Sequence, residues 1–226
     1  TGSSGKTSTK DMLAQILEIF GPVVAPVGSF NNEIGVPLTA CRSREDTAFL
    51  VSEMGARGLG HIAWLTSIVT PDVAMVLNVG TAHLGEFGSR KAIAQAKGEI
   101  VESLSADGWA VLNAADDLVA GMSPRTRGHI AWFSPDASHR RPDAEIEVWA
   151  ESIHADDLDR HSFILAVRRG ESTWRSPVRL TTMGAHQVAN AAAATAAALG
   201  ALAMSDEIDD QTVPRIAEAL SNAVSR

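Results

Sequence analysis

Cysteine is almost absent from this chain of 226 residues, in which Cys41 is the single example. One thiol excludes an intrachain disulfide framework and a metal cluster built from cysteines, and it fits a reducing compartment. Long hydrophobic runs are also missing, because no apolar stretch reaches the roughly 18–20 residues needed to span a bilayer. There is no signal-peptide pattern of basic flank, apolar stretch and cleavage site. We therefore expect a soluble cytoplasmic domain without membrane insertion.

Positive charge is in short supply as well. The chain has 19 Lys and Arg residues against 27 Asp and Glu residues, a net charge of −8. A general nucleic-acid binder usually presents a basic face, so nucleic acid is a disfavoured partner. The hydrophobic share of 45% and the charged share of 20% are ordinary for a globular protein with a sizeable core. The length predicts one large domain, or one domain with a small subdomain.

Short apolar runs alternate with helical patterns in the first part of the chain. The runs are PVVAPV (22–27), AFLVSE (48–53), VAMVLNV (73–79), WAVLN (109–113) and HIAWF (129–133). Stretches with a period near 3.6 residues lie between most of them, as at 61–69 and 91–104. Buried runs that alternate with helices are typical of βαβ units. We predict an α/β fold with a mainly parallel sheet flanked by helices.

From about residue 143 the pattern changes. Residues 143–182 contain three half-exposed strand patterns separated by turns, which predict a small antiparallel sheet attached to the main one. The alanine-rich segment 185–200 is expected to be a helix. A last helix is predicted at 212–224, with Thr212 near its cap and Pro214 in its first turn.

The segment TGSSGKTSTK (1–10) resembles the second half of a P-loop, which binds nucleotide phosphates. Glycines let backbone N–H groups turn inward as an anion-binding nest, and the following helix directs its positive end to the same place. Lys6 would reach the β- and γ-phosphates, and the Thr7 hydroxyl would bind Mg²⁺. The alternative is a flexible Gly/Ser terminus or a cloning remnant, against which the amphipathic helix that follows argues. The predicted phosphate-binding residues are Gly2, Ser3, Ser4, Gly5, Lys6, Thr7 and Ser8.

Two further candidates for a metal site follow predicted strands. Glu53 comes directly after the apolar run that begins at Ala48, at the carboxyl edge of the sheet where ligands bind in open α/β folds. An acid at this position commonly supplies the second metal-binding group of a P-loop protein. His83 lies in the loop after 73–79 and would bind a metal or orient a phosphate. The alternatives are a solvated strand-end glutamate and an ordinary loop histidine.

Lys97 is a lysine on an apolar helical face. With 91–104 placed on a helix, it falls within the stripe formed by Ile93, Ala96, Ile100, Val101 and Leu104. Such a lysine is paired, extends its ammonium to solvent, or has a lowered pKa. A neutral amine could react with CO₂ to give a carbamate, which is an anionic metal ligand, whereas a solvent-directed ammonium is the alternative.

The histidines outside that loop show less pattern. His186 and Asn190 lie one turn apart on the alanine-rich helix, hence on one face, although a plain polar helix edge remains open. The others show no partner pattern and are expected to be structural or surface residues: His61, His129, His139, His154 and His161.

Together these features resemble the ATP-binding central domain of the Mur ligases, the ATP-dependent amide ligases of peptidoglycan assembly. The segments that carry the resemblance occur in the family's order and span nearly the whole chain. They are TGSSGKTS (1–8), SFNNEIGVPLT (29–39), SEMGA (52–56), NVGTAHLGEFGS (78–89), AKGEI (96–100), LNAADD (112–117) and MGAHQVANAAAA (183–194).

The resemblance implies a role for several single residues. Lys6 and Thr7 would bind the ATP phosphates and Mg²⁺, with Lys6 also catalytic. Glu53 and His83 would be metal ligands, with His83 also catalytic. Lys97 matches the lysine that is carbamylated in several relatives and would act as a catalytic metal ligand in that form.

Three positions on other segments complete the implied site. Asn190 matches an asparagine near the adenine, although Gln187 stands where the family often has asparagine. Asn31 and Asn32 match a loop near the muramoyl-peptide substrate.

The motifs are most similar to the branch that joins D-alanyl-D-alanine to UDP-N-acetylmuramoyl-tripeptide through an acyl phosphate, and they imply a monomer. Mur ligases also carry an N-terminal UDP-sugar domain and a C-terminal domain, and neither is contained in residues 1–226. The alternatives are a tripeptide-forming Mur ligase, folylpolyglutamate synthase, a P-loop kinase or nucleotide switch, and a non-catalytic nucleotide-binding module.

Overall fold

A mixed sheet runs through the centre of the fold. The computed structural model describes residues 1–81 and 84–226. Four strands of the sheet run parallel to one another: β3 (Val73–Val76), β4 (Trp109–Asn113), β5 (His129–Phe133) and β6 (Ile146–Ala155). A separate parallel pair is formed by β1 (Val23–Val24) and β2 (Phe49–Leu50). The strands predicted from the five apolar runs are therefore confirmed.

The antiparallel part is continuous with the parallel part. Strand β7 (Arg160–Arg169) pairs antiparallel to β6, and β8 (Ser172–Met183) pairs antiparallel to β7. Since β6 also pairs parallel to β5, the sheet has the order β3-β4-β5-β6-β7-β8. The strands predicted within 143–182 thus extend the main sheet and form one surface with it.

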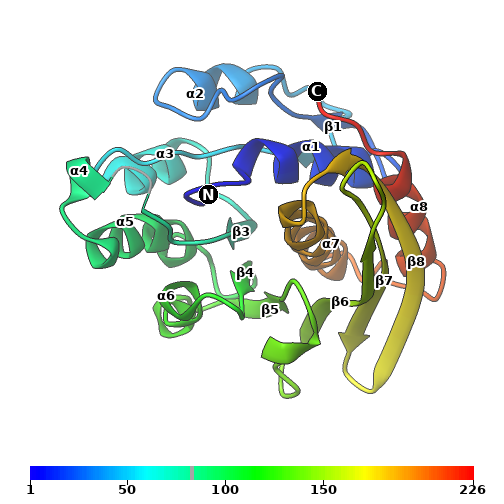
Figure 1. Ribbon diagram of the computed structural model, residues 1–226. Helices are drawn as coiled ribbons and strands as arrows, with labels where there is room; N and C mark the ends of the chain where they lie inside the picture. The colour runs from blue at the N-terminus through cyan, green and yellow to red at the C-terminus, as the bar shows by residue number, and fades with distance from the viewer. Residues whose placement is uncertain (82–83) are drawn as a thin grey trace.

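Helices cover both faces of this sheet, as Figure 1 shows. On one side lie α1 (Lys6–Leu17), α7 (His186–Ala203) and α8 (Thr212–Asn222), and on the other α3 (His61–Ile68), α5 (Arg90–Glu102) and α6 (Asp117–Ala120). The shorter helices are α2 (Gly35–Ala40), α4 (Leu84–Phe87), η1 (Ser123–Arg125) and η2 (Ala137–His139).

Strand β4 shows how the two helical layers arise from alternation. Its residues Trp109 and Val111 pack into the cluster with α1, α7 and α8, whereas Ala110 and Leu112 pack into the cluster with α3 and α5. Successive side chains of a strand point to opposite faces. A continuous apolar run therefore serves two cores.

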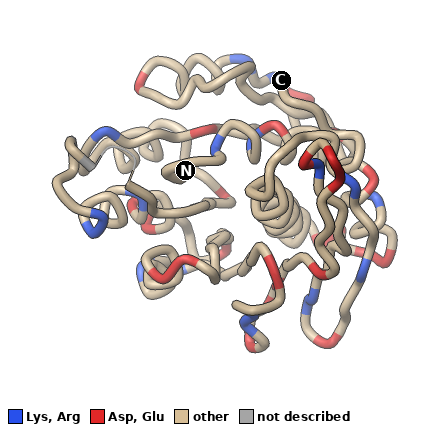
Figure 2. Tube along the Cα trace, viewed as in Figure 1, with Lys and Arg blue, Asp and Glu red and all other residues tan. Residues whose placement is uncertain are grey.

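The alanine content of α7 follows from its position between other elements. This helix contacts α1 and strands β3 to β8, and fourteen of its eighteen residues are buried. Short side chains let neighbours approach, and Gly200 lies close to Trp109. Figure 2 shows that α7 carries none of the charged residues that are interspersed along the rest of the trace. Over residues 1–81 and 84–226, no helix combines the length and apolar character that crossing a bilayer requires.

Candidate functional site

The glycine-rich segment enters α1 beside the carboxyl end of β3. The carbonyl of Thr1 accepts the N–H of Leu77 at 2.9 Å, and the N–H of Ser3 donates to the carbonyl of Asn78 at 3.1 Å. Gly5 then adopts a left-handed conformation with φ 78° and precedes the first residue of α1. A Cβ at Gly5 would lie 2.5 Å from Oδ1 of Asn190, so the turn requires glycine both for its φ and for space.

Asn78 holds this segment with its side chain, which the sequence did not predict. Its Oδ1 accepts the N–H groups of Ser3 and Ser4, each at 3.0 Å, and its Nδ2 donates to the carbonyl of Ser4 at 3.2 Å. The Ser3 hydroxyl in turn accepts the N–H of Gly80 at 2.9 Å. Ser3 and Ser4 therefore fasten the loop to the end of β3, which prearranges it without a ligand.

The backbone N–H groups at the start of α1 are placed to bind an anion. By helix geometry the N–H groups of Lys6, Thr7 and Ser8 have no acceptor within the helix, and among the described residues no side chain caps it. Lys6 folds back, and its Nζ donates to the carbonyl of Gly2 at 3.1 Å. The helix dipole adds a partial positive charge at the same point. These groups have the arrangement that the predicted anion-binding nest requires, and phosphate binding by them stays a prediction.

Glu53 meets Thr7 as a P-loop metal site requires. The Thr7 hydroxyl donates to Oε2 of Glu53 at 2.9 Å, although the two residues lie far apart in the sequence. Glu53 follows β2 and is 3% exposed, so the solvated alternative does not describe it. A carboxylate next to a hydroxyl oxygen is a set of hard ligands that suits Mg²⁺.

The loop between β1 and α2 supplies further contacts to this carboxylate. Oε1 of Glu53 accepts the Ser29 hydroxyl at 2.9 Å and Nδ2 of Asn31 at 2.6 Å. Asn32 instead caps α2, because its Oδ1 accepts the N–H of Gly35 at 2.9 Å. Both asparagines also line the cavity beside the P-loop. In this structure the side chain of Asn31 thus serves the carboxylate, and that of Asn32 serves the helix.

Lys97 faces the same cavity from α5. Its side chain is 5% exposed and lines a cavity of about 430 Å³ together with Lys6 and Gly2. Burial, and then the positive charge of Lys6, lower the pKa of Lys97 from 10.5 to about 8. A fraction of the amine is therefore neutral near physiological pH, which is the form that reacts with CO₂.

A further part of the cavity wall consists of residues that the sequence patterns did not place in the site. Arg57, His61 and Trp64 line it at and before α3. Glu99 of α5 fixes this wall, since its carboxylate accepts the N–H groups of Gly60 at 2.7 Å and Ala63 at 3.0 Å. His61, which was expected to be a structural or surface residue, is exposed and also lines this cavity. The signal that could have found this wall is its closeness in sequence to Glu53.

The remaining site predictions have mixed outcomes. Asn190 contacts the P-loop at Gly5, and its Nδ2 donates to Oε1 of Gln187 at 2.9 Å, both side chains being buried. His186, one turn before Asn190, is exposed. His83 lies outside the described residues, so its predicted metal role stays a prediction.

The groups at the P-loop and at Glu53 fit a nucleoside triphosphate with a divalent cation. Lys6 and the start of α1 offer positive charge and N–H donors, while Thr7 and Glu53 offer oxygen ligands beside them. The cavity that Lys6 shares with Lys97 and Arg57 is large enough for a second, anionic substrate group. The arrangement can therefore bring two anions together, which is the requirement for phosphoryl transfer to a carboxylate.

Comparisons with known proteins agree with this geometry. The Mur ligase middle domain family matches residues 1–198. The chain is 47% identical over 199 residues to a UDP-N-acetylmuramoyl-tripeptide–D-alanyl-D-alanine ligase of Mycobacterium tuberculosis (strain ATCC 25618 / H37Rv), covering 88% of this chain and 37% of that protein. It is 43% identical over 227 residues to the ligase of the same name from Mycobacterium leprae (strain TN), covering 100% and 43%.

Solved structures show the same relationship. A crystal structure of MurF from Acinetobacter baumannii superposes with a TM-score of 0.83 at 34% identity, covering 100% of this chain and 45% of that one. MurF ligase from Thermotoga maritima in complex with ADP gives a TM-score of 0.73 at 28% identity, covering 100% and 47%. The chain spans about two fifths of the length of the curated relatives it matches. From its P-loop, its fold and a family match over most of its length, the chain belongs to the Mur ligase family and corresponds to its middle domain.

Proposed function

We propose that this chain is the ATP-binding part of an ATP-dependent ligase that joins D-alanyl-D-alanine to UDP-N-acetylmuramoyl-tripeptide. The observation that carries the proposal is that Thr7 binds Glu53 directly after Lys6 in the chain, and that Lys6 lines one cavity together with Lys97. The relatives of Mycobacterium tuberculosis and Mycobacterium leprae bear the name of that activity.

In the proposed reaction the terminal carboxylate of the tripeptide attacks the γ-phosphorus of ATP, and the bond to ADP breaks. The amine of D-alanyl-D-alanine then attacks the acyl carbonyl, forms the amide and releases phosphate. Lys6 and the N–H groups at the start of α1 hold the phosphates and compensate their charge. Arg57, which lines the same cavity, offers a cation for the approaching carboxylate.

Thr7 and Glu53 are the residues that would hold Mg²⁺, with His83 and Lys97 as further ligands. A bound Mg²⁺ would neutralise charge on the transferred phosphoryl group. Lys97 would join this site as a carbamate, because its lowered pKa makes the neutral amine accessible. Asn190, which touches Gly5, would lie on the nucleotide side of the loop, and Asn31 and Asn32 on the side of the muramoyl peptide.

Phosphate release by the full-length parent enzyme tests the proposal. With ATP, Mg²⁺, UDP-N-acetylmuramoyl-tripeptide and D-alanyl-D-alanine, we expect turnover that Lys6→Ala lowers by about 10²-fold or more, because charge stabilisation at the transferred group is lost. Near-normal turnover of this variant would remove Lys6 from its assigned role. A screen of amine acceptors separates the proposed substrate from those of related ligases. Residues 1–226 alone should bind ATP weakly and ligate nothing.

A further inference from the structure

A buried ion pair lies on α1, one turn after the P-loop. Lys10 is 4% exposed, and its Nζ lies 2.6 Å from Oδ1 of Asp11. The same Nζ donates to the carbonyl of Pro26 at 2.7 Å and to that of Gly28 at 3.3 Å. These three acceptors match the three N–H donors of an ammonium group. A buried charge with such complete partners is costly to disturb, so its position in the fold is well defined.

The carbonyls that Lys10 binds belong to the loop between β1 and α2. Apolar burial holds only the start of this loop, at Pro26, because Val27 and Phe30 further along it are 66% and 53% exposed. Lys10 ties the loop backbone to α1 immediately before Ser29. Its polar contacts therefore restrain where Ser29 is placed, together with the hydrogen bond from the N–H of Gly55 to the carbonyl of Asn31 at 2.8 Å.

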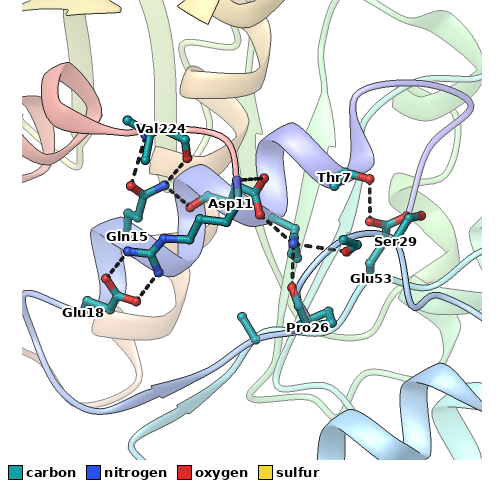
Figure 3. Close-up of polar contacts among 12 residues, drawn as sticks. Thr7, Asp11, Gln15, Glu18, Pro26, Ser29, Glu53 and Val224 are labelled. Carbon is teal, nitrogen blue, oxygen red and sulfur yellow. Dashed lines mark hydrogen bonds and ion pairs between the residues drawn. The ribbon is translucent and has the colours of Figure 1, made fainter. Parts of the chain in front are cut away.

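Ser29 connects this loop to the carboxylate of the candidate metal site. Its hydroxyl donates to Oε1 of Glu53 and also accepts Nδ2 of Asn31 at 2.8 Å. The other carboxylate oxygen receives Thr7. Figure 3 shows the sequence of contacts, with Thr7, Glu53 and Ser29 at one end of α1 and Pro26 beside Asp11 further along it.

We propose that Lys10 is a positioning residue for the metal site: by binding the carbonyls of Pro26 and Gly28, it sets the loop from which Ser29 and Asn31 orient the carboxylate of Glu53. Lys10 thereby fixes the positions of α1, of the loop between β1 and α2, and of the Glu53 carboxylate relative to one another before a ligand binds. The metal role of Glu53 rests on the proposed function, whereas the effect of Lys10 on the loop does not.

Hydrogen exchange in the full-length protein without metal or nucleotide tests the first part. Lys10→Met keeps the length and apolar stem of the side chain but removes its donors. We expect the amide of Gly55, which donates to the carbonyl of Asn31 at 2.8 Å, to exchange about tenfold faster, because the loop opens more often. Unchanged protection of this amide would overturn the proposal, and this result needs neither ATP nor substrate. It therefore differs from a failure of the ligase assignment, which would leave the exchange difference in place.

Calorimetric titration of MgADP tests the second part. Contacts to a metal-binding carboxylate typically affect metal affinity by about 10–100-fold, so Lys10→Met should weaken the apparent Mg²⁺ affinity by at least about tenfold. Ser29→Ala, which leaves Lys10 in place, should produce a similar loss, and it keeps the proposal testable if Lys10→Met does not fold. Unchanged Mg²⁺ affinity in Ser29→Ala would refute the path from loop to carboxylate.

Gln15→Ala is the matched control on the same helix. It removes the two hydrogen bonds between the Gln15 side chain and the backbone of Val224, at 2.8 and 3.1 Å, without touching the loop. Exchange of the Gly55 amide and Mg²⁺ affinity should both stay at the wild-type level. Equal losses in Gln15→Ala would mean that any weakening of α1 has this effect, and would refute a specific role for Lys10.

Discussion

Replacing Gly5 with alanine should damage the P-loop through two separable effects. The first is backbone strain, since Gly5 has φ 78° and ψ −4°, a left-handed conformation that costs an L-residue about 1–2 kcal/mol. The second is overlap, because the new Cβ would lie 2.5 Å from Oδ1 and 3.3 Å from Cγ of Asn190. Asn190 is buried and must move to relieve that overlap.

The cost of moving Asn190 follows from its contacts. Its Nδ2 donates to Oε1 of Gln187 at 2.9 Å, and the loss of one such bond costs about 1 kcal/mol. Together with the strain, Gly5→Ala should lower the free energy of unfolding by about 2–3 kcal/mol. The displaced amide also distorts the start of α1, so affinity for ADP should fall in parallel.

Urea denaturation followed by fluorescence of the five tryptophans measures the effect. Gly28→Ala is the matched control, because Gly28 has φ 73° but a Cβ there would meet nothing within 4 Å. It should show the strain alone, about 1–2 kcal/mol. In a double-mutant cycle, Asn190→Ala combined with Gly5→Ala should lose about 1 kcal/mol less than the sum of the two. If Gly5→Ala costs no more than Gly28→Ala, or the cycle shows no coupling, the overlap argument is wrong.

Three further predictions concern charged side chains elsewhere in the fold. Lys97→Met should raise the free energy of unfolding by up to about 3 kcal/mol at neutral pH in CO₂-free buffer, since the pKa of Lys97 is lowered from 10.5 to about 8. Between these two pKa values the unfolded chain binds more protons than the folded chain, so the wild type gains stability as the pH rises through this window. The stability difference between Lys97→Met and the wild type must therefore shrink, and a constant difference would show that the lowered pKa of Lys97 is not its cause. Gly98→Ala would place a Cβ onto Nη1 of Arg125, and chemical denaturation should show that it lowers the free energy of unfolding by about 1–2 kcal/mol. In an Arg125→Ala background the same change should lower it by almost nothing. Glu147→Ala removes a carboxylate that is 2% exposed and lies 3.0 Å from Arg140. Thermal unfolding of this variant should show a loss of stability of about 2–3 kcal/mol, which is less than for a fully buried pair because Arg140 is partly exposed. A loss near zero would contradict the pairing.

The elements of this fold are largely readable from local patterns. The apolar runs predicted strands β1 to β5, and the helical stripe placed Lys97 on a buried face, while it left open whether the ammonium extends to solvent. Such patterns work because strand and helix periods are properties of neighbouring residues. The continuity of β6 with β5 was less visible, since it depends on pairing between strands that local sequence does not encode.

The site divides in the same way. Lys6, Thr7 and Glu53 could be predicted, because a glycine-rich turn before a helix and an acid after a buried strand both lead to the carboxyl edge of the sheet. The partners that hold them could not. Asn78 binds Ser4 across 74 positions of the chain, and such contacts depend on how loops are packed.

The amino-acid sequence by itself thus determined the succession of strands and helices along the chain, the glycine-rich turn before α1 and the family to which the chain belongs. Only the tertiary structure decided which side chains restrain that turn and its carboxylate: Asn78 on the loop, Ser29 and Asn31 on Glu53, and Lys10 on the loop carbonyls. The physical reason is that a periodic pattern needs only neighbours. A hydrogen bond between distant loops requires the whole backbone to place donor and acceptor within about 3 Å of each other.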